Sequence, residues 1–241
     1  MKQCIAIDGP AGSGKSTMAR LLAEKLGYLY IDTGAMYRVL TAYFLANGVH
    51  YTDTQVLEKT LRKLLIEFIE RNDTVEIKLE GNPMGEEIRS PQVDEHVSSV
   101  ARIPEVRAYL RQLQRKLALS RPSVTEGRDI GTVILPDADL KIFLTASPTV
   151  RANRRFQQNK EKGLDTQYDT VLQNILERDS IDSTRKDAPL KKAKDAITVD
   201  TSSLSIDEVL GVLIDLVREE RPWYGDVSRK CKTGEQRNGN W

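Results

Sequence analysis

Eight residues near the amino terminus form a pattern that can bind phosphate. Residues 9–16 read Gly-Pro-Ala-Gly-Ser-Gly-Lys-Ser and match G-x-x-x-x-G-K-[ST]. Glycines in such a loop let backbone N–H groups approach an anion, the Lys15 amine can reach the β- and γ-phosphates, and the Ser16 hydroxyl can ligate Mg²⁺. An apolar run precedes the loop and a helical pattern follows it. We therefore expect a nucleoside triphosphate site rather than an ordinary glycine-rich turn.

The rest of the sequence indicates which class of nucleotide-binding protein this is. A GTPase would need an N/T-K-x-D motif to read its base, and the sequence has none. A motor or transporter ATPase usually ends a strand with an acidic residue for Mg²⁺ and water, whereas the apolar run 140–144 is followed by Thr145. This departure favours a small kinase over a hydrolase. A kinase of some other small acceptor and a nucleotide-dependent switch are the alternatives.

Two further segments place charged residues between small ones at the ends of apolar runs. They are 32–38 (DTGAMYR) and 126–131 (EGRDIG). The carboxyl ends of parallel strands face the ligand crevice, and arginines there can hold phosphate through paired, planar hydrogen bonds. Taken alone, each Arg–Asp pair is typical of a surface ion pair. Two of them at strand ends beside the phosphate loop favour a site for the acceptor.

A basic helical segment further along has the character of a lid. Arg151, Arg154 and Arg155 are spaced i, i+3 and i+4, so one helix face would carry all three. Arg178 and Arg185 add positive charge to the same region. In small kinases a mobile lid brings arginines over the transferred phosphoryl group, where they neutralise charge in the transition state.

The elements that must position these residues alternate along the chain. Short apolar runs alternate with stretches of helical periodicity, which predicts a parallel sheet with helices on both faces. Residues 54–71 are predicted as one helix, and residues 74–88 as a small antiparallel hairpin. The predicted strands of the sheet are 3–8, 28–31, 123–126, 140–145 and 196–200. The other predicted helices are 15–26, 35–47, 104–119, 149–161, 166–180 and one that begins with a capping box, Ser205 to Glu208.

The composition bounds the class of protein. The chain has 241 residues, enough for one large domain with inserts, and 36 Lys+Arg against 35 Asp+Glu give a net charge of +1. That balance argues against a dedicated nucleic-acid binder. The sequence has two cysteines, no secretory signal and no apolar run near the ~18 residues of a membrane span. We expect a cytoplasmic protein with no nucleic-acid or membrane partner.

Taken together, the motifs resemble those of the bacterial cytidylate kinases. The matching segments follow the family order and are IDGPAGSGKST, DTGAMYR, SSVARIPEVR, EGRDIGT, PDADLKIFLTAS and ERDSIDSTRKDAPL. They extend over about residues 3–219. The resemblance implies an α/β P-loop kinase: a parallel sheet core flanked by helices, an insert for the nucleoside monophosphate with a small antiparallel sheet, and a helical lid. It also implies a monomer that transfers the γ-phosphoryl group of ATP to CMP or dCMP with Mg²⁺ as cofactor.

The same resemblance divides the chain. Residues 1–220 would form a single P-loop kinase unit, and residues 221–241 a polar carboxyl-terminal tail. Within the unit, the core would comprise 1–71, 101–148 and 190–220, the insert about 72–100, and the lid about 149–189.

The site residues follow from their positions in the matched motifs. Lys15, Arg151, Arg154 and Arg155 would act on the transferred phosphoryl group. The ATP site would contain Gly9, Pro10, Ala11, Gly12, Ser13, Gly14, Lys15, Ser16 and Thr17, with Ser16 also on Mg²⁺. The CMP site would contain Thr33, Tyr37, Arg38, Ser98, Arg107, Arg128, Asp129, Arg178, Asp182 and Arg185.

The resemblance also assigns roles inside the CMP site. Arg38 and Arg128 would hold the phosphate with Thr33 nearby, Tyr37 would pack beside the base, Arg178 and Asp182 would contact the ribose, and Arg185 would close the pocket. Ser98, Arg107 and Asp129 would read cytosine, which offers an amino donor to a carboxylate and two acceptors to the other two side chains. Uracil reverses the polarity at position 4, so a carboxylate there would repel it. The acidic residues that balance these cations are expected to lie mostly elsewhere on the surface.

Overall fold

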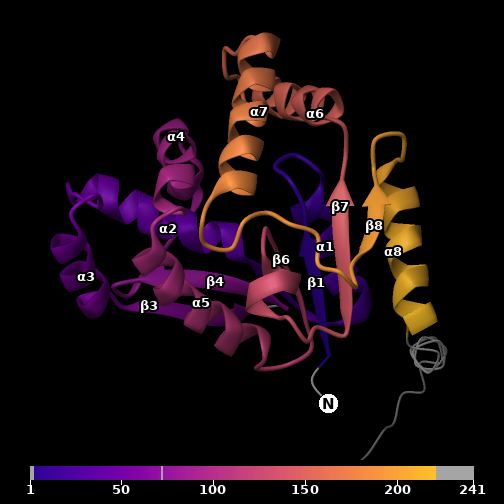
Figure 1. Cartoon of the computed structure of the whole chain (residues 1–241), viewed down its shortest axis with the longest axis horizontal. Coiled ribbons are helices and arrows are strands. Elements are labelled where there is room, and N and C mark those ends of the chain that lie inside the picture. Colours follow the sequence, from indigo (N-terminus) through magenta and orange to yellow (C-terminus); the bar gives the residue numbers. More distant parts are fainter. Residues whose placement is uncertain (1–2, 72, 221–241) are drawn as a thin grey trace, which may run out of the picture.

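The central sheet is parallel, as the alternation of strands and helices predicted. The computed structural model describes residues 3–71 and 73–220 (Figure 1). Five strands lie in the order β2-β6-β1-β7-β8. β1 is buried at every position because strands flank it on both sides and helices cover both faces. The strands are β1 (Cys4–Asp8), β2 (Leu29–Asp32), β6 (Ser123–Gly127), β7 (Leu140–Thr145) and β8 (Ile197–Asp200).

Alternate residues of these strands face two separate cores. Ile5 and Ile7 pack with α1 and α8, whereas Ala6 and Ile31 pack with α2 and α5. The predicted capping box at the start of α8 is confirmed, because Ser205 and Glu208 exchange backbone-to-side-chain hydrogen bonds. The four helices are α1 (Lys15–Leu26), α2 (Thr33–Ala46), α5 (Pro104–Ala118) and α8 (Ile206–Glu220).

The segment between α2 and α5 differs from the prediction in two respects. The single helix predicted over 54–71 is wrong: α3 (Thr54–Lys63) ends where Leu64 becomes extended, and β3 (Ile66–Arg71) pairs antiparallel with β4 (Thr74–Leu79). The small antiparallel sheet therefore begins before residue 72. Its third strand, β5 (Asn82–Pro83), is followed by a short 3₁₀ helix, η1 (Glu86–Arg89).

A helix that was not predicted, α4 (Pro91–Val100), completes this segment. Ser90 caps it by accepting a hydrogen bond from the backbone of Val93, and Pro91 occupies the first helical position, where its missing N–H costs nothing. In Figure 1, α4 stands beside α2 and points toward the lid.

The lid is a helical hairpin above the carboxyl ends of the parallel strands (Figure 1, top). Its helices, α6 (Pro148–Glu161) and α7 (Tyr168–Thr184), share a small apolar cluster of Ala152, Val171 and Ile175 that is separate from the two main cores. The predicted tail, 221–241, lies outside the described residues. Within the described part of the chain, no helix combines the length and apolar character needed to cross a membrane.

Candidate functional site

The phosphate loop joins β1 to α1 and packs against β7. Gly9 has φ 153°, and a Cβ at this position would collide with the backbone carbonyl of Leu144. Inside the loop the buried Lys15 amine donates a hydrogen bond to the carbonyl oxygen of Pro10 at 2.8 Å. The predicted ATP-binding residues 9–17 therefore form the loop after β1 and the first turn of α1, where a lysine and a helix amino terminus lie together, as a phosphate site needs.

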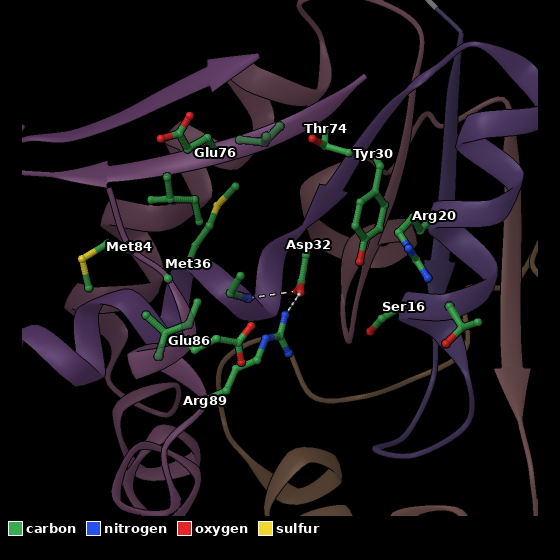
Figure 2. Close-up of a pocket in the computed structure, with 16 residues that line it drawn as sticks. Ser16, Arg20, Tyr30, Asp32, Met36, Thr74, Glu76, Met84, Glu86 and Arg89 are labelled. Carbon is green, nitrogen blue, oxygen red and sulfur yellow. Dashed lines mark hydrogen bonds and ion pairs between the residues drawn. The ribbon is translucent and has the colours of Figure 1, made fainter. Parts of the chain in front are cut away.

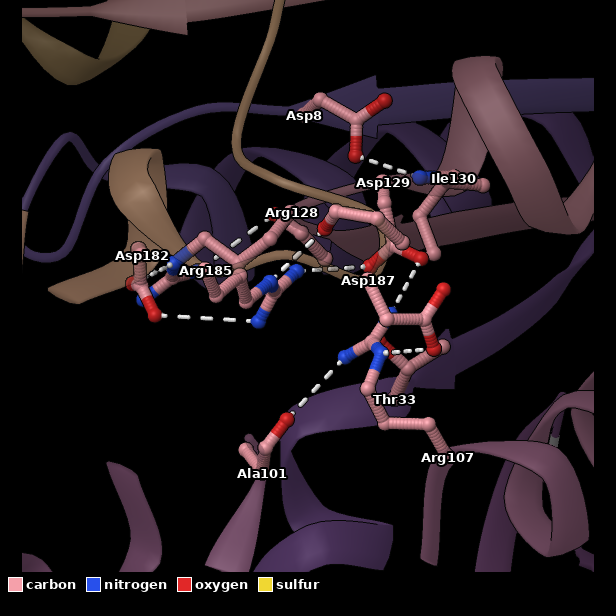
Figure 3. A network of polar contacts seen from close by, with 12 residues as sticks. Asp8, Thr33, Ala101, Arg107, Arg128, Asp129, Ile130, Asp182, Arg185 and Asp187 are labelled. Atoms are coloured by element: carbon pink, nitrogen blue, oxygen red, sulfur yellow. Dashed lines mark hydrogen bonds and ion pairs between the residues drawn. The ribbon is translucent and has the colours of Figure 1, made fainter. Parts of the chain in front are cut away.

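A buried carboxylate that the sequence did not single out connects this loop to the acceptor side. Asp8, the last residue of β1, accepts hydrogen bonds at 2.7 Å from the backbone N–H groups of Ile130 and Gly131 (Figure 3). Burial raises the pKa of Asp8 to about 6, although these two hydrogen bonds lower it. Asp8 thereby fixes the turn that follows Asp129.

A second buried acid, Glu126, lies at the end of β6 beside Asp32 of β2. Burial raises the pKa of Glu126 and Asp32 raises it further, while Lys15 and a hydrogen bond from Ser16 oppose the shift. Burial, together with the neighbouring Arg128, lowers the pKa of Lys15. The phosphate loop thus contacts Glu126, which belongs to the predicted segment 126–131 but for which the sequence predicted no role of its own.

A cavity of about 450 Å³ opens next to the phosphate loop, between β2, η1 and the small sheet (Figure 2). Ser16 and Asp32 both line it. One oxygen of Asp32 accepts a hydrogen bond from the backbone of Ala35 at 2.9 Å, and the other lies 3.5 Å from the guanidinium of Arg89. The Ser16 hydroxyl and the carboxylates of Asp32 and Glu126 are the oxygen donors that Mg²⁺ prefers. The residues present therefore fit the cation that the sequence predicted.

Four of the predicted CMP-binding residues meet at the carboxyl end of β6. Arg107 and Asp129 form an ion pair at 2.6 Å between Nη2 and Oδ2, and Asp129 Oδ1 accepts a hydrogen bond from Arg185 at 3.2 Å (Figure 3). The guanidinium carbon of Arg107 lies 5.8 Å from the centre of the Tyr37 ring. Ser98 lies half-buried on α4.

A second group of predicted residues forms a positively charged cluster. Arg128 donates a hydrogen bond to Asp182 at 2.8 Å. Arg178 is half-buried, and within the described residues its buried Nε has no hydrogen-bond partner. Burial lowers the pKa of Arg178 to about 10, and the nearby charges of Arg128 and Arg38 contribute to that shift. Thr33 lies buried at the start of α2, where its hydroxyl donates to a backbone carbonyl of β6.

Arg151 anchors the base of the lid. Its guanidinium donates to the carbonyl oxygens of Ala146 at 2.9 Å and Ala11 at 3.1 Å, and to both oxygens of Asp179 at 3.0 and 2.6 Å. The side chain is 4% exposed. One residue therefore ties α6 to the phosphate loop and to α7, a positioning task that the helical spacing did not indicate.

The other two lid arginines contact different parts of the site. Arg154 donates to the hydroxyl and carbonyl of Thr201, after β8, at 2.9 and 2.6 Å. Arg155 forms an ion pair with Asp94 of α4 at 2.6 Å, and the other oxygen of Asp94 lies 2.6 Å from Arg38. Asp94 thus joins a lid arginine to a predicted phosphate-binding arginine.

The expectation that the balancing acids lie mostly elsewhere is wrong. Burying clustered arginines without counter-charges is costly, and aspartates in the site itself offset most of that cost. Their partners come from distant parts of the chain, so sequence spacing gives no signal of the pairing. The ion pairs are Arg38–Asp94, Arg155–Asp94, Arg107–Asp129, Arg185–Asp129, Arg107–Asp187, Arg128–Asp182 and Arg151–Asp179.

The fold and the site define a class of protein: a P-loop kinase with a cluster of arginines suited to a second, anionic substrate. Residues 5–219 match the protein family described as cytidylate kinase. The chain therefore belongs to the cytidylate kinase family.

Individual relatives agree with that assignment. A cytidylate kinase of Carboxydothermus hydrogenoformans is 48% identical over 213 residues, which cover 88% of this chain and 96% of the relative. A cytidylate kinase of Fervidobacterium nodosum is 49% identical over 215 residues, covering 89% and 96% respectively. A solved structure of an uncharacterized protein from Eubacterium ventriosum superposes with a TM-score of 0.50 at 15% identity, covering 91% of this chain and 99% of that one. That likeness concerns the fold alone.

Proposed function

We propose that the protein transfers the γ-phosphoryl group of ATP to CMP or dCMP, yielding ADP and CDP or dCDP. The observation that carries the proposal is the buried Nε of Arg178, which has no hydrogen-bond partner among the described residues and lies with Arg38 and Arg128 in one cluster. A cluster of guanidinium groups that remains short of counter-charge is suited to a dianionic phosphate. This cluster is linked through Glu126 and Arg128 to the phosphate loop that would hold the donor.

The chemistry requires positioning and charge neutralisation rather than a general base. An anionic phosphate oxygen of CMP attacks the γ-phosphorus of ATP, and the bond between that phosphorus and the β–γ bridging oxygen breaks as ADP leaves. Lys15 in its charged form stabilises the charge on the β- and γ-phosphates, and Arg154 and Arg155 approach the transferred group from the lid. Mg²⁺, which Ser16 with Asp32 or Glu126 would hold, supplies further neutralisation of the phosphates.

Selection of the base follows from the ion-paired cluster. Asp129 accepts a hydrogen bond from the cytosine amino group, and Arg107 and Ser98 donate to the ring acceptors, while Tyr37 packs beside the ring. Burial raises the pKa of Asp129, but Arg107 and Arg185 favour its charged, accepting form. Uracil would present a carbonyl oxygen to this carboxylate, so UMP is disfavoured.

The ribose would lie between the two groups of arginines. Burial raises the pKa of Asp182, yet Arg128 and Arg178 outweigh it and hold that pKa below its usual range. A carboxylate that stays ionised can accept a hydrogen bond from a sugar hydroxyl. The monomeric state, the cytoplasmic location and the division into core, insert and lid stay predictions.

Replacing Lys15 tests the proposed phosphoryl transfer. Because burial disfavours the charged form of this lysine in the free protein, Lys15→Ala removes a function without removing a source of stability. We expect ADP release in the presence of CMP to fall by about a thousandfold, with circular dichroism and thermal unfolding unchanged. Turnover close to that of the unchanged protein would contradict the proposal.

A further inference from the structure

A tight turn follows the lid helix α7 and carries two opposite charges. Arg185 Nε donates to the carbonyl of Ala188 at 2.7 Å, and the backbone N–H of Leu190 donates to the carbonyl of Asp182 at 2.7 Å. One side-chain and one backbone hydrogen bond therefore close the turn. Ala188 adopts a left-handed conformation with φ 49°, which is uncommon for a residue other than glycine. The turn presents Arg185 and Asp187 toward the same ion pair (Figure 3).

Five side chains of alternating charge form a chain through this region. Arg185 contacts Asp129 at 3.2 Å, and Asp129 contacts Arg107 at 2.6 Å. Arg107 Nε donates to Asp187 Oδ2 at 3.2 Å, and Arg111 Nη2 lies 3.1 and 3.0 Å from the two oxygens of Asp187. The two outer contacts to the Arg107–Asp129 pair therefore both come from this turn: Arg185 contacts Asp129, and Asp187 contacts Arg107.

The guanidinium of Arg107 is held in one plane by acceptors on three sides. Nη2 donates to Asp129, Nη1 donates to the carbonyl of Ala101 at 3.3 Å, and Nε donates to Asp187. The Arg107 side chain is 1% exposed, so its donors are satisfied by these protein acceptors. Asp187 is 37% exposed and is itself fixed by Arg111. Removing Asp187 would take away the charged acceptor of Nε and one of the three contacts that fix the orientation of the guanidinium.

We propose that Asp187 is a positioning residue that sets the base selectivity of the kinase by fixing the orientation of Arg107. It acts through Arg107 rather than on a substrate, and it links the end of the lid to base recognition. The inference rests on the proposed function, in which Arg107 and Asp129 read cytosine. The donor side of the site lies at the phosphate loop, so Asp187 has no part in binding ATP.

Steady-state kinetics of Asp187→Ala test this role. We expect the KM for CMP to rise about tenfold, as for the loss of one hydrogen bond to a buried charged group, with kcat at saturating CMP and the KM for ATP unchanged. The ratio of kcat/KM for CMP to that for UMP should fall by about the same factor. Asp187→Glu, which can still accept from Arg107, should recover part of both values.

Two further variants keep the test decisive. Asp215→Ala removes an aspartate–arginine ion pair of 3.1 Å on the exposed face of α8, and it should change none of these constants. If Asp187→Ala does not fold, Asp187→Asn, which keeps an acceptor oxygen but loses the charge, should show a smaller change in the same direction.

An unchanged CMP:UMP ratio in a folded Asp187 variant would overturn the proposal. So would an equal loss in kcat and in both KM values, because that pattern indicates general damage to the fold. The proposed function is tested separately by the unchanged protein: if it phosphorylates another nucleotide better than CMP, that function fails whatever the Asp187 variants do.

Discussion

Single residues in this site have pKa values that differ from those of solvated side chains. Asp8 is the clearest case, because it is almost fully buried and its pKa is raised by that burial to about 6. A carboxyl whose pKa is higher in the folded than in the unfolded protein contributes stability below the unfolded value, and that contribution is lost as the pH rises through the folded value. The acid that fixes the turn after Asp129 is therefore a stability cost at neutral pH.

Asp8→Asn measures that cost. The rise in the pKa of Asp8, from 3.8 to about 6, predicts that the free energy of unfolding of the unchanged protein, relative to Asp8→Asn, falls by about 2 kcal/mol between pH 4 and pH 7. Denaturant titrations of both proteins at several pH values between these limits give the difference directly. If the unfolding free energy of the unchanged protein, relative to Asp8→Asn, stays constant or rises with pH, the pKa of Asp8 is not raised in the folded protein.

The residue types that do chemistry could be predicted from the sequence, but their partners could not. The phosphate loop and the arginines of the acceptor side stood out through their motifs. Asp94 lay outside the matched segments, and Asp179 and Asp187 lay inside one but received no role, because an aspartate in a polar helix or turn has no pattern that distinguishes an ion pair in the site from a solvated side chain. Only the packing of α4 and α7 around the arginines gives these acids their roles.

At the scale of elements, the lid depends on polar anchors more than on its own core. The apolar contact between α6 and α7 is small, whereas Arg151 connects α6 with the phosphate loop and with Asp179 of α7. Arg155, on the same helix face, reaches α4 instead and is 41% exposed. The two arginines therefore have different tasks, although their spacing suggested the same one.

Alanine variants of these two arginines should separate stability from catalysis. Arg151→Ala leaves Asp179 without its partner and should lower the free energy of unfolding by about 3 kcal/mol. Arg155→Ala breaks an exposed pair, so the free energy of unfolding should change by less than about 1 kcal/mol, while kcat falls by about a hundredfold or more. Thermal unfolding and kcat measured on both variants test this division. An Arg151→Ala protein as stable as the original, or an Arg155→Ala protein with normal kcat, would refute it.

The errors in predicting elements have a common physical cause. Apolar residues over 54–71 fit a helix, but Ile66 and Phe68 also fit a strand. In the structure they pair with Leu79 and Ile77 of β4, so this part forms a strand. The hairpin predicted over 74–88 was right over 74–79, where apolar and polar residues alternate strictly, but wrong after Pro83, where the 3₁₀ helix η1 replaces the second strand. Short apolar runs do not reveal their partners, so local periodicity settles an element only where it is long or regular.

At the scale of the whole molecule, the net charge of +1 conceals a local excess. Aspartates pair with most arginines of the crevice, but Arg178 keeps a buried N–H without a partner among the described residues. An almost neutral protein can therefore bind two polyanionic nucleotides in one crevice without a basic surface that would attract nucleic acid.

The rate of phosphoryl transfer to a panel of nucleoside monophosphates tests the central claim most directly. With Mg²⁺ and ATP held constant, kcat/KM should be highest for CMP and dCMP and much lower for UMP, AMP and GMP, because only cytosine offers an amino group to Asp129 and acceptors to Arg107 and Ser98. ADP release should also require an acceptor. Equal or faster transfer to UMP, AMP or GMP, or ADP release that no acceptor changes, would contradict the account.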